Sequence, residues 1–261
     1  MTYFEKEKNL VNVLQEIPCS ETLFLSKRLN LRMLYSKIHN SFVWETHWED
    51  CSSKGALPPD FFSDKFKLML EVMRVDDHGY KKKGKYINPT YERERVIEKK
   101  LKQCIGDDGV YESLNIFVVP DTQLSTEQDH NYKFYLENFR RVLNKHKSKI
   151  DTYRKNHPGY KIVFYVFDES CAYMLPADPS VKRLKHGETV TGQPHNHFLD
   201  TAFLECFIES DIDYLIWCTP FKMFISSDGV VDFPKVCVFD CKKKIKQQMC
   251  YDKDRMIATE E

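Results

Sequence analysis

Two short runs of almost uninterrupted apolar residues constrain the fold of this chain more than any other feature. Residues 160–170 read YKIVFYVFDES and residues 213–220 read DYLIWCTP. A strand with one solvent face alternates apolar and polar residues, so these runs predict strands that are covered on both faces. A helical pattern precedes each run, at 128–156 and at 197–210. We therefore expect an α/β fold with a mixed central β-sheet flanked by helices.

The first third of the chain predicts a different local arrangement, in which strands follow one another directly. Helical spacing covers 9–17 and 22–39, with Ser20 as a possible cap of the second helix. Residues 41–48, SFVWETHW, alternate in a way that suits a strand, and a short strand at 60–62 and a strong strand at 66–75 follow. Three further elements are expected along the chain: a helix at 88–104, a buried strand at 113–120 and an edge strand within 230–240. The three early strands must then be hairpin-like.

Composition limits the class of protein. The 39 basic and 39 acidic residues cancel, so the net charge gives no general attraction to nucleic acid. The nine cysteines are scattered without a CxxC pair, which is unlike a zinc ribbon or a disulfide framework. The N-terminal MTYFEKEKNL is charged and carries no apolar segment of membrane-spanning length. We expect one cytoplasmic domain over 1–261, with reduced thiols and no membrane contact.

The stretch ALPPDFFSDKFKLMLEVMRVDDH, residues 56–78, carries the most suggestive chemistry. If the residues after Pro59 form a strand antiparallel to 66–75, Asp60 and Glu71 can lie close together. Mg²⁺ and Mn²⁺ favour oxygen ligands, so two carboxylates with a backbone carbonyl can hold such an ion. The alternative is structural, with Asp60 as a strand-start residue and Glu71 paired with a lysine across the sheet.

This pattern resembles the PD-(D/E)XK, or restriction-endonuclease-like, phosphodiesterase superfamily. Pro59-Asp60 is followed by the triplet Glu71-Val72-Met73, and the order of helix, three strands, helix and strand is similar as well. The resemblance covers about 20–170, and 171–261 would be a C-terminal elaboration. It implies a nuclease in which Asp60 and Glu71 bind Mg²⁺ or Mn²⁺ and Val72 offers its carbonyl. It also implies a further acid, for which Glu21 or Glu45 are the candidates.

The chain departs from the family at one position that matters for catalysis. Met73 stands where the family has a lysine, and Met can neither orient a water nor stabilise negative charge. Lysines from other elements are possible replacements: Lys65, Lys67 and Lys99. The same departure supports an alternative, a catalytically inactive relative that uses the nuclease fold to bind nucleic acid or protein.

A nuclease also needs positive charge along its substrate. The lysines that follow the motif strand suit this role, and we expect them to bind nucleic acid: Lys81, Lys82, Lys83 and Lys85. Their alternative role is that of solvated loop residues. Trp44 and Trp48 can stack on bases or, as large aromatics often do, fill the core.

Two further groups of residues are secondary candidates. His195 and His197, with Asp200 after them, have a spacing that can hold zinc, although Asn196 in front of a helical pattern also suits a helix cap. Asp168 and Glu169 end a buried strand, where α/β proteins often place functional groups. Phosphate-binding glycine loops, HExxH and GxSxG motifs do not occur in the sequence. A cysteine nucleophile stays open, because nothing marks one cysteine above the others.

Overall fold

The structure is a computed structural model of the whole chain, and its described part covers most of the sequence. The described residues are 7–26, 28–52, 58–77, 80–82, 85–87, 96–97, 99–101, 103–104, 130–184, 189–226 and 229–259. The predicted strand at 113–120 and most of the predicted helix at 88–104 lie outside these ranges. The described residues between 96 and 104 are helical.

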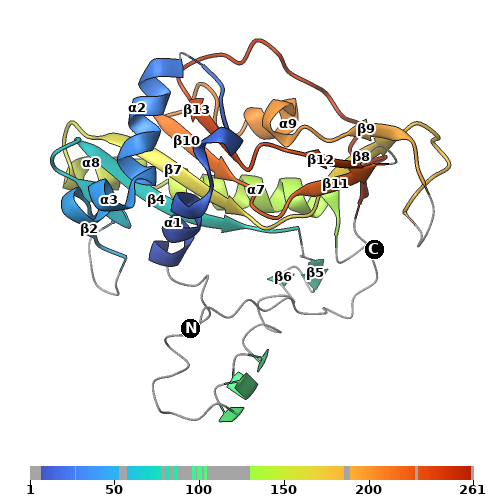
Figure 1. Cartoon of the computed structure of the whole chain (residues 1–261), viewed down its shortest axis with the longest axis horizontal. Coiled ribbons are helices and arrows are strands. Elements are labelled where there is room, and N and C mark those ends of the chain that lie inside the picture. Colours follow the sequence, from blue (N-terminus) through green and yellow to red (C-terminus); the bar gives the residue numbers. More distant parts are fainter. Residues whose placement is uncertain are drawn as a thin grey trace.

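A seven-stranded mixed sheet forms the centre of the molecule, in the order β1-β13-β10-β7-β4-β3-β2 (Figure 1). Its strands are β1 (Thr22–Phe24), β2 (Glu49–Asp50), β3 (Phe61–Ser63), β4 (Leu68–Val75), β7 (Lys161–Asp168), β10 (Tyr214–Cys218) and β13 (Val236–Asp240). Strands β4, β7 and β10 are parallel, whereas β3 is antiparallel to both of its neighbours. The predicted mixed α/β sheet is confirmed.

Helices cover both faces of the sheet, which explains the continuous apolar runs of β7 and β10. One face carries α1 (Glu7–Glu16), α2 (Arg28–His39) and α3 (Ser41–His47), and the other carries α7 (Tyr132–Lys147), α8 (Ile150–Asn156) and α9 (Thr201–Leu204). Residues of β4 alternate between the two faces: Leu70 and Val72 pack on the α1 side, and Met69 and Met73 pack on the α7 side. The sheet therefore separates two hydrophobic cores.

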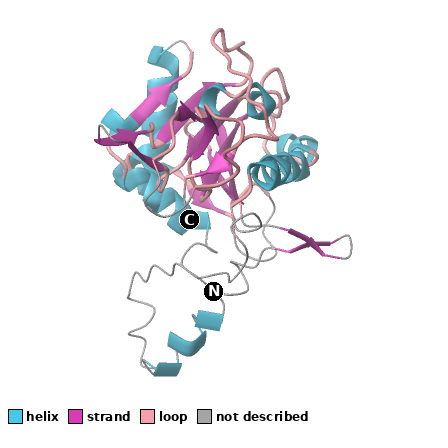
Figure 2. Cartoon of the chain, turned by 90° about the vertical axis from the view of Figure 1, so that its right-hand side faces the viewer, coloured by secondary structure: helices cyan, strands magenta, loops and turns pink. Residues whose placement is uncertain are grey.

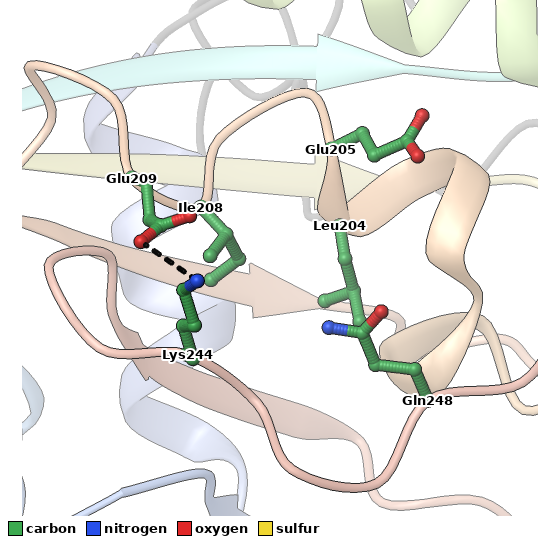
Figure 3. Close-up of a pocket in the computed structure, with 6 residues that line it drawn as sticks. All are labelled: Leu204, Glu205, Ile208, Glu209, Lys244 and Gln248. Atoms are coloured by element: carbon green, nitrogen blue, oxygen red, sulfur yellow. Dashed lines mark ion pairs between the residues drawn. The ribbon is translucent and has the colours of Figure 1, made fainter.

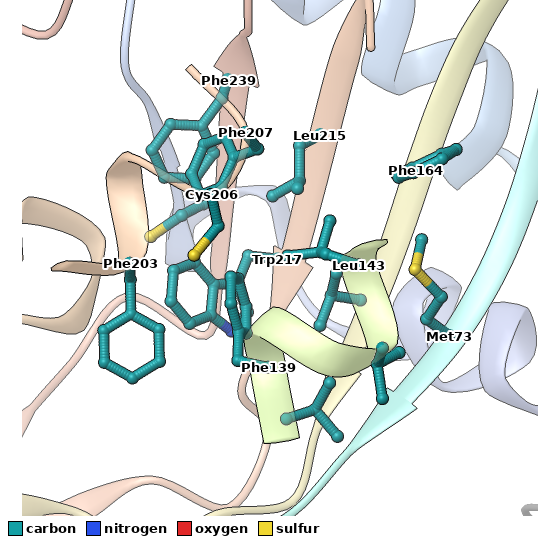
Figure 4. Close-up of a cluster of buried hydrophobic side chains, with 14 of the residues drawn as sticks. Met73, Phe139, Leu143, Phe164, Phe203, Cys206, Phe207, Leu215, Trp217 and Phe239 are labelled. Atoms are coloured by element: carbon teal, nitrogen blue, oxygen red, sulfur yellow. The ribbon is translucent and has the colours of Figure 1, made fainter. Parts of the chain in front are cut away.

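The core on the α7 side is built from aromatic rings (Figure 4). Trp217 of β10 is fully buried and its ring centroid lies 4.5 Å from that of Phe139 on α7. Phe203 of α9 lies 5.5 Å from the same indole ring. Contacts of this kind, each worth about 0.5–1.5 kcal/mol beyond simple area burial, fix α7 and α9 against the sheet.

Smaller sheets accompany the central one. They comprise β8 (Tyr173–Pro176) with β9 (Gly192–Pro194) and β14 (Ile257–Ala258), β11 (Met223–Ser226) with β12 (Gly229–Asp232), and β5 (Tyr80–Lys82) with β6 (Lys85–Ile87). Two 3₁₀ turns, η2 (Cys19–Glu21) and η3 (His197–Leu199), complete the described elements. None of the nine cysteines, all of which are described, forms a disulfide.

The prediction of a strand at 41–48 was wrong, because this segment is the helix α3. The side chain of Asn40 accepts a hydrogen bond from the Val43 amide at 3.0 Å and so caps the helix. Helical spacing brings Trp44 and Trp48 to the same side, where their rings stack with centroids 4.8 Å apart. Both are buried in the core, and the indole of Trp48 donates to the Lys37 carbonyl at 2.8 Å. Of the two roles considered for these tryptophans, the structure shows core packing.

Other boundaries differ from the sequence prediction as well. Residues 22–24 are not helical but form the edge strand β1, because they pair in parallel with β13. Strand β13 accordingly lies inside the sheet rather than at its edge. The predicted helix at 128–156 is divided at 148–149 into α7 and α8, and 197–210 forms only η3 and α9. Strands β10 and β13 of the C-terminal third join the same sheet as β2, β3, β4 and β7.

Candidate carboxylate site of the β3–β4 hairpin

The register of the β3–β4 hairpin brings Asp60 beside Glu71. Phe61 pairs with Leu70, so Asp60, one residue earlier, stands next to Glu71, one residue later. The Asp60 amide donates to Glu71 Oε2 at 3.3 Å, and Asp60 Oδ2 accepts from the Val72 amide at 2.8 Å. The proximity that the sequence predicts for these two carboxylates is therefore present.

Two groups from the helix layer hold the second oxygen of Glu71. His146 of α7 contacts Oε1 through Nδ1 at 2.6 Å, and the hydroxyl of Tyr153 on α8 donates to the same oxygen at 2.7 Å. Glu71 is 3% exposed, and it lies on the face of β4 that packs against these helices. Its Oε1 is thus fixed from above the sheet, whereas its Oε2 is directed toward Asp60.

The electrostatics of the pair are unusual for a carboxylate site. Burial and then the adjacent charge of Glu71 raise the pKa of Asp60 to about 8. The Val72 amide opposes this shift, Glu7 at the start of α1 adds to it, and Lys149, just before α8, reduces it. At neutral pH Asp60 therefore retains its proton, because two ionised carboxylates cannot share a buried site without a cation.

Other residues predicted for this site lie elsewhere. Glu45 is exposed on α3, and α3 belongs to the opposite face of the sheet from Glu71. The prediction that Glu45 faces the pair assumed a strand at 41–48, and it was wrong because this segment is the helix α3. Glu21 is exposed in η2. Met73 is buried in the core, as its apolar side chain requires.

The lysines considered as replacements for the motif lysine are engaged or exposed. Lys65 lies 2.7 Å from His47 Nε2, and Lys67 donates to the Tyr160 hydroxyl at 3.1 Å. Lys99 is exposed in the helical residues before 104. Sequence reasoning did not find Lys149, His146 or Tyr153. All three belong to α7, α8 or the break between them, more than 70 residues after Glu71 in the chain.

The lysines predicted to bind nucleic acid belong to a small antiparallel hairpin. Strands β5 and β6 pair Lys82 with Lys85 and Lys81 with Tyr86. Lys83 lies outside the described residues. In Figures 1 and 2 this hairpin stands apart from the seven-stranded sheet.

The acidic residues at the end of β7 form a network that is satisfied by the protein itself. Asp168 is fully buried, and its Oδ2 accepts from the Tyr135 hydroxyl at 2.5 Å and from the Trp217 indole at 2.8 Å. Lys222, 2% exposed, lies 3.4 Å from the same oxygen. Ser170 donates to Asp168 Oδ1 through its amide and hydroxyl. Glu169 instead makes a two-point ion pair with Arg74.

The two histidines of the His-x-His pattern have different surroundings. His195 Nε2 lies 2.7 Å from Asp200 Oδ2, an oxygen that also accepts from the Tyr132 hydroxyl. His197 is fully buried beside the Trp217 ring, and neither ring nitrogen has a hydrogen-bond partner among the described residues. Burial lowers the pKa of His197 well below its usual value, so the ring is neutral. The α9 cap is Asp200, which accepts from the Ala202 amide, rather than Asn196.

A surface pocket of about 300 Å³ is lined by residues other than those described above (Figure 3). Leu204 and Ile208 form its apolar side, and Lys244 pairs with Glu209 across it at 3.6 Å. Its mixed lining contains neither a histidine nor a cysteine. The charged groups of the lining are the carboxylates of Glu205 and Glu209 and the ammonium group of Lys244.

Comparison with known proteins identifies no relative. No protein-family model, no curated protein and no solved structure matches the chain. Among the described helices, none has the length and apolarity needed to span a bilayer.

Proposed function

We propose that the protein is a divalent-metal-dependent phosphodiesterase that acts on nucleic acid at the Asp60–Glu71 pair. The observation that carries this proposal is the meeting of two carboxylates at which burial and the charge of Glu71 raise the pKa of Asp60 to about 8. Such a pair takes up either a proton or a cation, and Mg²⁺ or Mn²⁺ is the cation that carboxylate oxygens favour.

The residues around the pair fit a metal site. Glu71 Oε2 and the carboxylate of Asp60 would hold the ion, and the resemblance adds the carbonyl of Val72. His146 and Tyr153 fix Glu71 through Oε1, which is the outer support that orients metal-binding carboxylates. When bound, the ion would polarise the phosphoryl group of the substrate and lower the pKa of a bound water. The carboxylates position that chemistry at the start of β3.

The topology around the hairpin supports the same proposal. Strands β2, β3 and β4 form an antiparallel meander. After the separate β5–β6 hairpin comes α7, and β7 then pairs in parallel with β4. This is the order of strands and helix that the resemblance to a restriction-endonuclease-like core implies. We propose this core for residues 20–170, with β10 and β13 as the C-terminal elaboration.

Positive charge near the reacting phosphate must come from a residue other than Met73. The charge of Lys149 lowers the pKa of Asp60, although this effect is smaller than the increases caused by burial and by Glu71. The side chain of Lys149 is exposed and can approach a substrate from the α8 side. We assign to Lys149 the charge-stabilising role of the missing lysine, and to Lys81, Lys82, Lys83 and Lys85 the binding of the nucleic-acid backbone.

A second function is favoured by the burial of Glu71. A side chain that is 3% exposed and holds two donors from α7 and α8 also suits a purely structural role. In that case the protein keeps a nuclease-like fold and binds nucleic acid or protein without cleaving it.

The test is cleavage of supercoiled plasmid, single-stranded DNA and RNA in Mg²⁺ or Mn²⁺. Glu71→Gln retains an oxygen that accepts from His146 and Tyr153 but removes the charge. Asp60→Asn likewise retains an oxygen that accepts from the Val72 amide but removes the acid group. Each should lower cleavage by at least about 100-fold, the order expected when a group essential for metal-assisted hydrolysis is lost. Glu205→Gln, a change of an exposed acid at the end of α9, should retain wild-type activity. A folded wild-type protein that cleaves none of the three substrates would support the binding function instead.

A further inference from the structure

A second group of metal-binding side chains lies at the far end of β4. Asp77 follows β4, His130 precedes α7 and Cys171 follows β7, and one ligand atom from each lies within 4.8 Å of the others. Asp77 is six positions beyond Glu71, which is about 20 Å along an extended strand. This group is therefore separate from the hairpin pair.

The spacing of the ligand atoms suits coordination. Asp77 Oδ2 and His130 Nδ1 are 3.3 Å apart, which is long for a charged hydrogen bond. Two ligands bound tetrahedrally to zinc at 2.0–2.1 Å lie about 3.3 Å from each other. Asp77 is fully buried and Cys171 is 3% exposed, so the group is largely shielded from solvent.

Neighbouring donors already orient the Asp77 carboxylate. The Tyr173 hydroxyl donates to Asp77 Oδ2 at 2.6 Å and the Cys171 amide donates at 3.0 Å. Both donors come from the segment that carries Cys171, and the amide of Cys171 itself holds the Asp77 carboxylate near this residue. Metal-binding carboxylates are commonly held by hydrogen bonds of this kind.

We propose that Asp77, His130 and Cys171 bind one zinc ion. Sulfur, imidazole nitrogen and carboxylate oxygen together suit Zn²⁺, whereas Mg²⁺ and Ca²⁺ prefer oxygen alone. Three protein ligands are the number found in catalytic zinc sites, whose fourth position takes water or a substrate oxygen. The site lies at the carboxyl-terminal ends of the parallel strands β4 and β7, where α/β proteins commonly bind ligands.

The proposal is tested by metal content and by cobalt spectroscopy on the full chain. Purified wild-type protein, stripped with chelator and reloaded with zinc, should retain about one zinc per chain after gel filtration. The Co²⁺-loaded protein should show a thiolate-to-cobalt charge-transfer band together with the strong visible bands of tetrahedral coordination.

Variants assign the site to these residues. Cys171→Ser should abolish the charge-transfer band and weaken zinc binding by more than about 100-fold, since loss of an outer-shell partner alone costs 10–100-fold. His130→Asn should weaken binding similarly. Cys206→Ser, a change of another buried cysteine, and Glu71→Gln should leave both readouts unchanged. Wild-type protein that retains no zinc, or a charge-transfer band that survives Cys171→Ser, would overturn the proposal, whatever the outcome of the cleavage assay.

Discussion

The hairpin pair and the Asp168 network both bury carboxylates, but they compensate that burial differently. Asp168 is surrounded by donors of its own chain, including the buried ammonium group of Lys222. Asp60 and Glu71 instead bring two acids together, and burial with the Glu71 charge raises the pKa of Asp60 to about 8. A buried charge is costly unless it is paired. Lys222 provides that pairing for Asp168, whereas Asp60 avoids the cost by keeping its proton at neutral pH.

The contrast indicates where function is to be sought. The charges of the Asp168 network are balanced within the fold, which suits a structural role. Asp60 of the hairpin pair keeps a proton at neutral pH, and this is where we propose that a cation binds. The sequence suggested both regions as candidate acidic sites. The structure distinguishes them, because Lys222 lies beside Asp168 whereas Glu7 and Lys149 act on Asp60.

The largest effect on stability is expected from removing the carboxylate of Asp168. Asp168→Ala leaves Lys222 buried without its carboxylate and removes an acceptor from Tyr135 and Trp217. We expect the free energy of unfolding to fall by about 3–5 kcal/mol, measured by urea denaturation. The double variant Asp168→Ala/Lys222→Met should lose less than the sum of the two single variants. A loss below about 1 kcal/mol for Asp168→Ala would show that the two regions do not differ in this way.

A smaller loss is expected when the outer support of Glu71 is removed. Tyr153→Phe deletes the hydroxyl that donates to Glu71 Oε1, a bond to a charged acceptor worth about 1.5–3 kcal/mol. It should also weaken Mn²⁺ binding by about 10–100-fold. The matched control is Tyr165→Phe, whose hydroxyl donates to the Leu10 carbonyl at 2.8 Å and should cost stability without changing metal binding. Equal effects of the two variants on metal affinity would contradict a supporting role for Tyr153.

The pH dependence of stability should reveal the shared proton of the pair. The pKa of Asp60 rises from 3.8 to about 8 on folding. Between these values the unfolded chain loses the proton that the folded chain keeps, so stability contributed by this group falls as pH rises, and the loss ends near pH 8. Urea denaturation in chelator at pH 5, 6, 7 and 8 should show a flatter profile for Asp60→Asn. Parallel profiles for variant and wild type would mean that Asp60 is already ionised when folded.

The smallest effect is expected from the lysines of the β5–β6 hairpin. Replacing Lys81, Lys82 and Lys85 with Gln should weaken DNA binding. The slope of log K against log salt concentration should become shallower by about 0.9 for each phosphate that the protein no longer neutralises. The control is the triple change of Lys242, Lys243 and Lys244 to Gln, which alters an equal charge in another part of the chain. Identical losses in both triple variants would indicate a general charge effect rather than a binding hairpin.

Local patterns in the sequence were sufficient for much of the fold. The continuous apolar runs located β7 and β10, because strands covered on both faces need no polar residues. Two-residue periodicity placed Asp60 beside Glu71, since the register of a short hairpin is set by the few residues between its strands. Residues 41–48 misled the prediction because their β-branched and aromatic side chains suit strands, while the cap that starts the helix is Asn40, outside the segment.

Partnerships between distant residues could not be predicted in the same way. Lys222 is 54 residues from Asp168, and nothing in the local sequence marks it as buried. His146 and Tyr153 approach Glu71 from two helices, and Phe139 packs the first of them, α7, against Trp217. Asp77, His130 and Cys171 likewise come from three different segments. Their meeting follows from the packing of the sheet and helices, which no spacing within one segment encodes.

The most direct test of the central claim is calorimetric titration of Mn²⁺ into the wild-type protein and Asp60→Asn at pH 7. Repeating each titration in two buffers of different ionisation enthalpy gives the number of protons released. A site that exchanges its shared proton for a cation predicts one Mn²⁺ bound with nearly one proton released, and loss of both in Asp60→Asn, while Cys171→Ser retains them. Mn²⁺ binding without proton release, or binding that Asp60→Asn leaves intact, would contradict the assignment of the Asp60–Glu71 pair as the metal site.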